Sequence, residues 1–303
     1  MTATSAIPVV LALLLAPVLP GLISRTKSIV AGRTGPPIIQ VYFDLAKLLR
    51  KGAVYSRTTT WVFRAGPVVG LASVVTALLL LPGAGLTAPL AFTGDVIVFV
   101  YLLALMRFFA VAAALDTGSS FEGMGASRES AFSVPAELAM LLGLATLART
   151  TGELSLSTML IPRPESAWLG MGPALGLVVV ALFVVLLAEN SRIPVDDPAT
   201  HLELTMIHEV MVLDHGGPDL AMIEYASAVK LWIFEALLVD LVLPTHLGSL
   251  WIDAAVFLAG MAAASVAVGL VESTMARLQL PRVPQLMLGA SVLAAFSLVL
   301  TLR

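Results

Sequence analysis

The sequence contains no cysteine. Disulfide bonds and iron–sulfur clusters held by Cys thiolates are therefore excluded from this chain. Charge is also scarce: Asp, Glu, Lys and Arg make up 12% of the 303 residues, against about 25% in soluble domains. Hydrophobic residues instead reach 58%, and the mean hydropathy is +0.97. This composition indicates an integral membrane protein, which we expect to form one helical domain over residues 1–303.

Positive charge is also missing before the first apolar run. The segment MTATSAIPVVLALLLAPVLPGLI holds no Lys or Arg, and the first cations are Arg25 and Lys27. A secretory signal peptide begins with a positively charged region. We therefore expect this run to be a retained membrane helix and not a cleaved signal.

Long apolar runs recur along the chain. A hydrocarbon core of about 30 Å needs about 20 mostly apolar residues per helix. The stretches that satisfy this requirement predict eight spans, at about 5–24, 66–90, 95–115, 133–150, 167–188, 221–243, 250–271 and 283–302, the second with an earlier possible end at Pro82-Gly83. The two halves show no matching pair of broken helices, the pattern typical of inverted-repeat transporters, so a secondary transporter is disfavoured.

The basic residues predict the orientation, because cytoplasmic loops carry an excess of Lys and Arg. Eight spans place both termini on one side of the membrane. Loops on the other side carry Arg25, Lys27, Arg33, Lys47, Arg50, Lys51, Arg57, Arg64, Arg128, Arg192, Arg277 and Arg282. The side of the termini has only Arg149, Arg163 and Arg303. We therefore expect both termini outside, with cytoplasmic loops at about 25–65, 116–133, 189–220 and 272–283.

The first of these loops contains an amphipathic segment, IIQVYFDLAKLLRKG, at residues 38–52. Its apolar side chains recur at helical spacing, whereas Lys47 and Arg50 lie on the opposite side with Asp44 and Lys51. This pattern predicts a short helix in the plane of the membrane interface, ended by Gly52. It could serve only as a positive anchor, or it could dock a partner or substrate.

Several charges fall inside the predicted spans. Arg107 interrupts the apolar run VFVYLLALMRFFAVAAAL, and the predicted span 221–243 carries Glu224, Lys230, Glu235 and Asp240. Charges at this depth are costly unless they face a partner or water. Lys230 and Glu235 are separated by about 140° around a helix, so each should have its partner on another helix. Such pairs could hold the bundle together, relay protons, or do both.

The segment at 188–219, AENSRIPVDDPATHLELTMIHEVMVLDHGGPD, is rich in acidic side chains and histidines. Before its final Asp219 they are Glu189, Asp196, Asp197, Glu203, Glu209, Asp214, His201, His208 and His215. Asp197 and Pro198 predict the start of a helix that continues to near His215. A metal site is disfavoured because His201 and His208 would lie about 10.5 Å apart along this helix, and no HExxH pattern is present. A proton-exchanging chain of carboxylates and histidines and an acidic surface that binds a basic protein both remain open.

The same segment resembles the hallmark loop of a known membrane-subunit family. That family includes the quinone-site subunit of respiratory complex I (its subunit 1) and its relatives in membrane-bound group 4 nickel–iron (NiFe) hydrogenases. The shared core, Ala-Glu-x-x-Arg-x-Pro-x-Asp, falls on Ala188, Glu189, Arg192, Pro194 and Asp196. The hydrogenase branch, found in formate hydrogenlyase-type complexes, is indicated by GRTGPPIIQVYFDLAKLLRKG, LDTGSSFEGMGASRES, ENSRIPVDDPATHLELTMIHE and VESTMARLQLPR.

The resemblance implies an eight-span helical bundle in which acidic residues begin a hydrated path for ions. By motif position, Glu137, Glu189 and Glu224 match glutamates of that path. Glu203 matches the second glutamate of a Glu-x-Glu pair in complex I, whereas His201 stands in place of the first, so the path should differ there. We therefore assign the relay to Glu137, Glu189, Glu203, Glu209, Asp214, Glu224, Lys230, Glu235, Asp240, Arg107 and His201.

The resemblance further implies a non-catalytic subunit that anchors a hydrogenase module in a prokaryotic cytoplasmic membrane. The expected partners are the large and the small (iron–sulfur) hydrogenase subunits, antiporter-like membrane subunits and the lipid bilayer, with no nucleic acid. The NiFe centre and the iron–sulfur clusters are expected in the partner subunits, and no metal or cofactor in this chain. We assign docking of the peripheral arm to Arg128, Glu129, Arg192, Asp196, Asp197, Lys47 and Arg50. The alternatives are a quinone-site subunit of a complex I-type enzyme and a stand-alone ion transporter.

Overall fold

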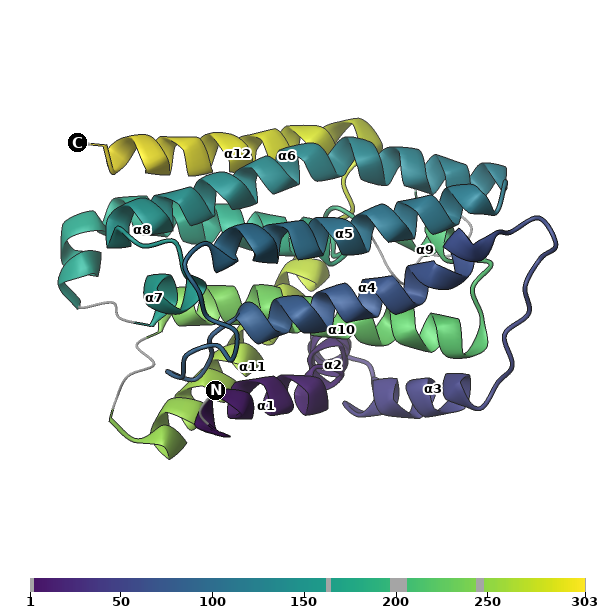
Figure 1. The fold of residues 1–303 in the computed structure, drawn as a ribbon, viewed down its shortest axis with the longest axis horizontal. Coiled ribbons are helices and arrows are strands. Elements are labelled where there is room, and N and C mark those ends of the chain that lie inside the picture. The colour runs from purple at the N-terminus through teal and green to yellow at the C-terminus, as the bar shows by residue number, and fades with distance from the viewer. Residues whose placement is uncertain (1–2, 162–164, 197–205, 244–247, 303) are drawn as a thin grey trace.

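The computed structural model describes residues 3–161, 165–196, 206–243 and 248–302, and the regular secondary structure in this part of the chain consists of helices, without a β-strand (Figure 1). The helical fold class is thereby confirmed. The helices are α1 (Ile7–Leu15), α2 (Val18–Val30), α3 (Gln40–Leu49), α4 (Trp61–Leu80), α5 (Asp95–Asp116), α6 (Ser120–Thr151), α7 (Leu156–Leu160), α8 (Glu165–Glu189), α9 (His208–Met211), α10 (Gly217–Val242), α11 (Leu250–Thr274) and α12 (Val283–Leu300), with 3-10 turns at Ala3–Ala6 and Leu280–Arg282.

Six described segments are long and apolar enough to cross a membrane: α4, α5, α6, residues 170–189 of α8, α11, and residues 280–300 including α12. The first predicted span, 5–24, is instead the bent pair α1 and α2, which meet at an angle of 49° near Pro17 and could form a seventh span. Helix α10 falls outside this group because of its charged side chains. The count of eight spans and the location of the termini stay predictions.

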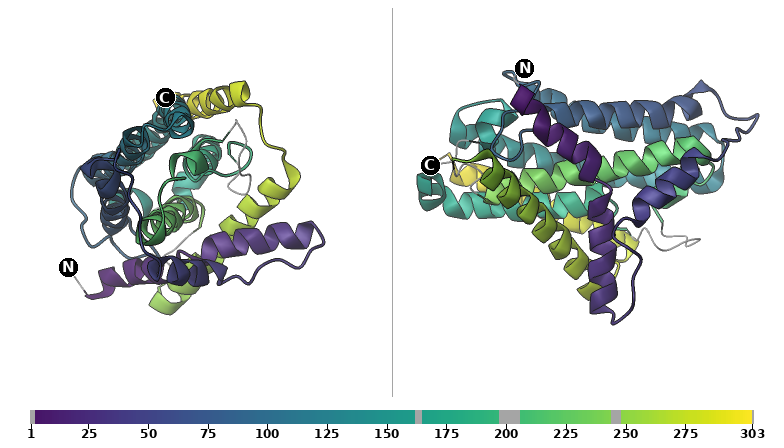
Figure 2. Two further views of the ribbon diagram at one scale, coloured as in Figure 1. Left: turned by 90° about the vertical axis from the view of Figure 1, so that its right-hand side faces the viewer. Right: turned by 90° about the horizontal axis from the view of Figure 1, so that it is seen from below.

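Helix α10 lies inside the bundle (Figure 2, left), with α8 beside it and the other long helices around them. From Ala228 to Leu241 every residue of α10 is buried, including Lys230, Glu235 and Asp240. Its neighbours include α4, α11, α3 and α8. A charged helix is acceptable at this position because the surrounding helices, and not lipid, face its polar side chains.

The predicted loop at 116–133 is wrong, because α6 begins at Ser120 and continues to Thr151 as one long helix. The polar residues that suggested a loop have partners within the protein. Arg128 donates to the carbonyl oxygen of Met206, and Glu122 accepts from the backbone N–H of Asp214. Pro135 lies inside the helix without ending it, and Ser291 of α12 donates to its carbonyl oxygen over 2.8 Å.

Two further boundaries differ from the predictions. Helix α4 begins after Thr60, whose side chain accepts from the Val62 N–H, and ends at Leu80 just before Pro82-Gly83, the earlier of the two predicted ends. The helix predicted to reach His215 ends at Met211, because the chain then turns and the Asp214 N–H bonds to Glu122 instead. The predicted N-cap at Asp197 lies outside the described residues.

The short helix predicted in the first loop is present as α3, which packs against α10 and α2. None of its residues is fully buried, and Lys47 and Arg50 are exposed. The Tyr42 hydroxyl bonds to the carbonyl oxygen of Leu14 and ties α3 to α1. Its location at a membrane interface stays a prediction.

Candidate functional site

Arg107, in the middle of α5, lies among three carboxylates. Its guanidinium contacts Glu137 of α6 and Glu189 at the end of α8, and its Nε lies 3.3 Å from Glu129 Oε1 of α6. The Arg107 side chain is 8% exposed. The prediction that this buried cation faces partners is confirmed.

Glu189 also contacts a second cation. Lys230 Nζ of α10 lies 2.7 Å from Glu189 Oε2, so one buried carboxylate joins α5, α8 and α10. Glu235, further along α10, accepts from Ser265 Oγ of α11 over 3.0 and 2.8 Å. Lys230 and Glu235 therefore each have a partner on a different helix, as their separation around α10 predicted.

His208 extends this set of contacts into the loop. Its Nε2 lies 3.3 Å from Glu129 Oε2, and its Nδ1 lies 3.8 Å from Asp196 Oδ2. Asp196 in turn accepts from the N–H groups of Ile207 and His208 over 3.2 and 3.0 Å, and from Arg277 Nη2 over 2.8 Å. The contacts therefore run without a break from α10 to the connection between α11 and α12. We call this set the ion-pair chain: Lys230, Glu189, Arg107, Glu137, Glu129, His208, Asp196 and Arg277.

The two members in the loop have shifted acidities. Burial alone would lower the pKa of His208, but the carboxylates of Glu129 and Asp196 outweigh burial and raise it from 6.5 to about 9. Burial would raise the pKa of Asp196, but the neighbouring His208 and Arg277 lower it. At neutral pH His208 is therefore an imidazolium held between two carboxylates.

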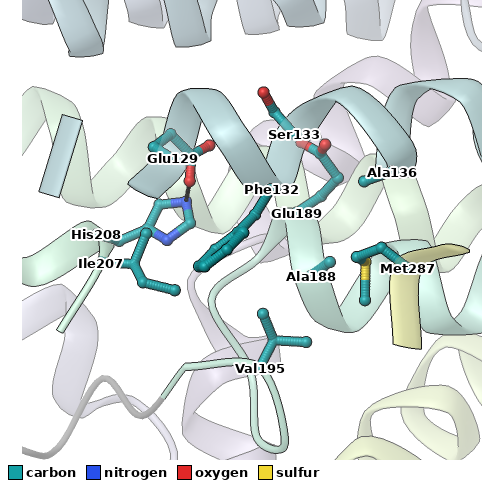
Figure 3. A pocket seen from close by; sticks show the side chains of 10 residues that line it. All are labelled: Glu129, Phe132, Ser133, Ala136, Ala188, Glu189, Val195, Ile207, His208 and Met287. Carbon is teal, nitrogen blue, oxygen red and sulfur yellow. Dashed lines mark ion pairs between the residues drawn. The ribbon is translucent and has the colours of Figure 1, made fainter. Parts of the chain in front are cut away.

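A small pocket adjoins the ion-pair chain between α6, α8 and the loop (Figure 3). Polar groups of Glu129, Ser133, Glu189 and His208 line it, together with the apolar side chains of Phe132, Ala136, Ala188, Val195, Ile207 and Met287. Convergent polar groups of this kind can hold a water molecule that bridges them. Glu129 and Glu189 therefore share this pocket in addition to their common contact with Arg107.

Close packing of α9 on α6 positions His208. A Cβ atom added to Gly125 would clash with Val210 Cγ1 and lie 2.8 Å from the Ile207 carbonyl oxygen. One turn on, Arg128 Nη1 donates to the Met206 carbonyl oxygen over 2.9 Å. Gly125 and Arg128 therefore hold residues 206–210 against α6, the helix that carries Glu129.

A second set of contacts fastens residues 190–196 to the connection after α11. Glu272 pairs with Lys27 of α2 over 2.7 Å and with Arg192 over 3.5 Å. The Leu278 N–H donates to the Pro194 carbonyl oxygen over 2.9 Å. Docking of a peripheral arm by Arg192, Asp196, Arg128 and Glu129 stays a prediction, and within the chain all four side chains hold the loop or the ion-pair chain in place.

Other predicted relay residues lie apart from the ion-pair chain. Glu224 is half-buried close to Asp44 of α3 and to Glu209, and Asp214 is exposed. Asp240 is buried near the end of α10, and among the described residues neither of its carboxylate oxygens has a hydrogen-bond partner. Glu203, His201 and Asp197 lie outside the described residues.

The relay residues predicted from the sequence did not include Glu129 or His208. Arg277 and Glu272 were assigned neither to the relay nor to docking. One signal was available for Glu129, because it stands four and eight residues before Ser133 and Glu137 and therefore shares a face of α6 with them. No local pattern links Arg277 to Asp196, which is far away in the sequence. Among the described residues, no group of three His, Asp or Glu side chains is placed to hold a metal ion.

Comparison with known proteins places this geometry in a family. The model of the NADH dehydrogenase family, which is complex I subunit 1-like, matches residues 3–302. The chain belongs to this family. It is 30% identical to formate hydrogenlyase subunit 4 of Escherichia coli strain K12 over 304 residues, covering 96% of this chain and 97% of the relative.

Other relatives are also named as components or subunits of larger enzymes. Hydrogenase-4 component C of the same organism is 32% identical over 237 residues, covering 78% of this chain and 73% of the relative. An NADH-quinone oxidoreductase subunit of Rubrobacter xylanophilus is 26% identical over 216 residues, covering 67% and 61%. A chain in the structure of the membrane-bound sulfane sulfur reductase, an archaeal respiratory membrane complex, superposes with a TM-score of 0.84 at 20% identity and 98% coverage of both chains, which shows a common fold. The chain is therefore a complex I-like membrane subunit.

Proposed function

We propose that this chain is the membrane-anchoring and ion-coupling subunit of a group 4 NiFe-hydrogenase complex of the formate hydrogenlyase type. The relatives that cover most of the chain, formate hydrogenlyase subunit 4 and hydrogenase-4 component C, support the hydrogenase branch. The proposed partners are the large and small hydrogenase subunits, which would carry the NiFe centre and the iron–sulfur clusters, and antiporter-like membrane subunits. The proposed location is a prokaryotic cytoplasmic membrane.

The observation that carries the coupling role is the ion-pair chain itself. It begins at Lys230 inside the bundle and reaches Asp196 and Arg277 in the loops. Burying this many charges is expensive, and buried ion pairs are weak contributors to stability compared with well-packed apolar side chains. Their retention is better explained by movement of a proton or ion along them. Glu235 and Asp240 lie further along α10, each about 7.5 Å along the helix axis from the preceding charged residue, and they face other sides of the helix.

Glu137 supports the proposed membrane partners. It lies within the span of α6, and yet its side chain is 33% exposed, next to the exposed Val134, Leu138 and Leu141. A carboxylate that faces acyl chains at this depth is costly even when it contacts Arg107. We infer that another membrane subunit covers this face of α6, which would bring Glu137 to the boundary between the two proteins.

Quinone reduction is the second candidate function, and the relative named as part of an NADH-quinone oxidoreductase favours it. Against it, the first loop lacks the longer Gly-Pro-Asn-Arg pattern that complex I members carry near the quinone cavity. The two functions predict different products, hydrogen for the first and reduced quinone for the second.

The deciding experiment purifies the complex through a tag on this chain, identifies the accompanying subunits, and assays hydrogen evolution from reduced methyl viologen beside quinone reduction. Ions moved per hydrogen evolved are then measured in sealed vesicles for the parent complex and for Glu137→Gln, Glu189→Gln and the control Glu153→Gln. Glu153 is exposed beyond the end of α6 and outside the ion-pair chain.

We expect all three variants to assemble. The number of ions moved per hydrogen evolved should fall at least fivefold in Glu137→Gln and Glu189→Gln and stay unchanged in Glu153→Gln. Quinone reduction without hydrogen evolution would establish the second candidate. Isolation of an active homo-oligomer without redox subunits would exclude both and leave a stand-alone transporter. An unchanged ratio in both Glu137→Gln and Glu189→Gln would contradict the coupling role.

A further inference from the structure

The net charge of the ion-pair chain is zero only when His208 carries a proton. Its four carboxylates belong to Glu129, Glu137, Glu189 and Asp196. Its permanent cations are Arg107, Lys230 and Arg277. A protonated His208 supplies the fourth positive charge, whereas a neutral His208 leaves one negative charge in excess. Histidine is also the one member whose charge changes readily near physiological pH.

His208 is placed to exchange that proton with water. Its side chain is 28% exposed, whereas the side chains of Glu129 and Asp196 beside it are 9% and 2% exposed. The groups that face the imidazole are Glu129 from α6, Asp196 from the loop and, at longer range, Lys230 from α10. His208 is therefore more exposed than either carboxylate that it contacts, and the one more exposed member of the ion-pair chain, Glu137 at 33%, lies on the face of α6 that we infer a membrane subunit covers.

Resting on the function proposed above, we propose that His208 is the port through which protons enter the ion-pair chain, and that Glu129 is the first carboxylate to receive them. The proton leaves Nε2 of the imidazolium and binds Oε2 of Glu129, which gives a neutral imidazole and a neutral carboxyl group. One N–H bond breaks and one O–H bond forms, with no change of oxidation state. His208 then takes a second proton from solvent.

The pocket beside these residues provides the next step. Glu129 and Glu189 both line it (Figure 3), and the Ser133 hydroxyl beside them donates to the Ser130 carbonyl oxygen of the same helix over 3.2 Å. A bridging water there can pass the proton from Glu129 to Glu189, and Arg107 and Lys230 stabilise Glu189 in its charged form before the transfer. Entry at His208 thus leads to the carboxylate that joins the three central helices.

A purely structural ion pair is the rival explanation, and His208→Arg separates the two. Arginine keeps the positive charge between Glu129 and Asp196 but does not release a proton at accessible pH. If His208 only holds the loop, this variant keeps its activity. If His208 is the port, the variant assembles and turns over slowly.

The test uses the whole complex in sealed vesicles, with reduced methyl viologen as electron donor, and follows hydrogen evolution and ion movement from pH 6 to 10. In the parent complex we expect coupled turnover to fall as pH rises through about 9, where His208 loses its proton. His208→Arg should be at least tenfold slower without that fall, and Glu153→Gln should match the parent.

Glu129→Gln provides an independent measurement if the arginine variant does not assemble. Glutamine keeps a hydrogen-bond acceptor for Nε2 but cannot take up the proton as a carboxylate does, so coupled turnover should fall at least tenfold while the complex still assembles. Parent-like rates in His208→Arg, or parent-like coupled turnover in Glu129→Gln, would overturn the proposal. If Glu189→Gln still uncouples the complex, only the port is wrong. If Glu189→Gln is also without effect, the coupling function itself fails.

Discussion

Lys230 Nζ lies 2.7 Å from Glu189 Oε2, and the other oxygen of the same carboxylate contacts Arg107. Three helices that are far apart in the sequence therefore meet at one buried side chain. Glu189 also belongs to the Ala-Glu-x-x-Arg-x-Pro-x-Asp core that first indicated the family. This carboxylate consequently serves both the packing of the bundle and the proposed route of ions.

The first prediction concerns Lys230. Lys230→Met leaves Glu189 with one cation in place of two, and loss of a partner from a buried ion pair costs about 3 kcal/mol. The matched control is Lys47→Met on the exposed side of α3, for which we expect less than about 0.5 kcal/mol. The measurement is the fraction of folded complex after heating, followed by size-exclusion chromatography. Adding Glu189→Gln to Lys230→Met should restore part of the stability, and equal losses in the two single variants would contradict the assignment.

The second prediction uses two glycines of the same helix. Gly125→Ala places a Cβ against Val210 and 2.8 Å from the Ile207 carbonyl oxygen, so α9 must move away from α6, at a cost of about 1–3 kcal/mol. In Gly123→Ala the added Cβ meets nothing within 4 Å, and Ala favours the helix by about 0.5–1 kcal/mol. Thermal unfolding midpoints of the two variants should therefore shift in opposite directions. A parallel shift would mean that α9 does not pack on Gly125.

The third prediction compares the two ion pairs that fasten the loop. Arg277 and Asp196 are 2.8 Å apart and both largely buried, so a double-mutant cycle with Arg277→Met and Asp196→Asn should give a coupling of about 1–3 kcal/mol. The Arg192–Glu272 pair is longer, at 3.5 Å, and Glu272 also has Lys27 as a partner. Its cycle, with Arg192→Met and Glu272→Gln, should give a smaller coupling. The reverse order would show that the longer pair is the main fastening.

The sequence predicted the helical class, the family, and the need for partners of Arg107 and Lys230 on other helices, but not which residues those partners are, because only the first three depend on local composition or on a motif. It did not predict that polar residues 120–133 are helical, because their partners, such as Met206 for Arg128, come from elsewhere in the chain. For the same reason Glu129 was assigned to docking of the peripheral arm and not to the relay. The position of His208 depends on the tight contact at Gly125, and that contact leaves no periodic pattern in the sequence.

The last prediction is a pH dependence of stability. The pKa of His208 is about 9 in the folded chain and 6.5 in the unfolded chain, so its contribution is fully present below pH 6.5 and is lost as pH rises through 9. Because the side chain is partly exposed, we expect it to contribute about 1–2 kcal/mol to the free energy of unfolding. The pH dependence from Asp196 has the opposite sign. Its pKa is lowered in the folded chain, so its contribution to the free energy of unfolding is lost only under acid conditions. Thermal unfolding from pH 6 to 10 should therefore show the parent complex losing stability relative to His208→Gln above pH 6.5. Parallel curves for the two proteins would mean that His208 is not held as an imidazolium by Glu129 and Asp196.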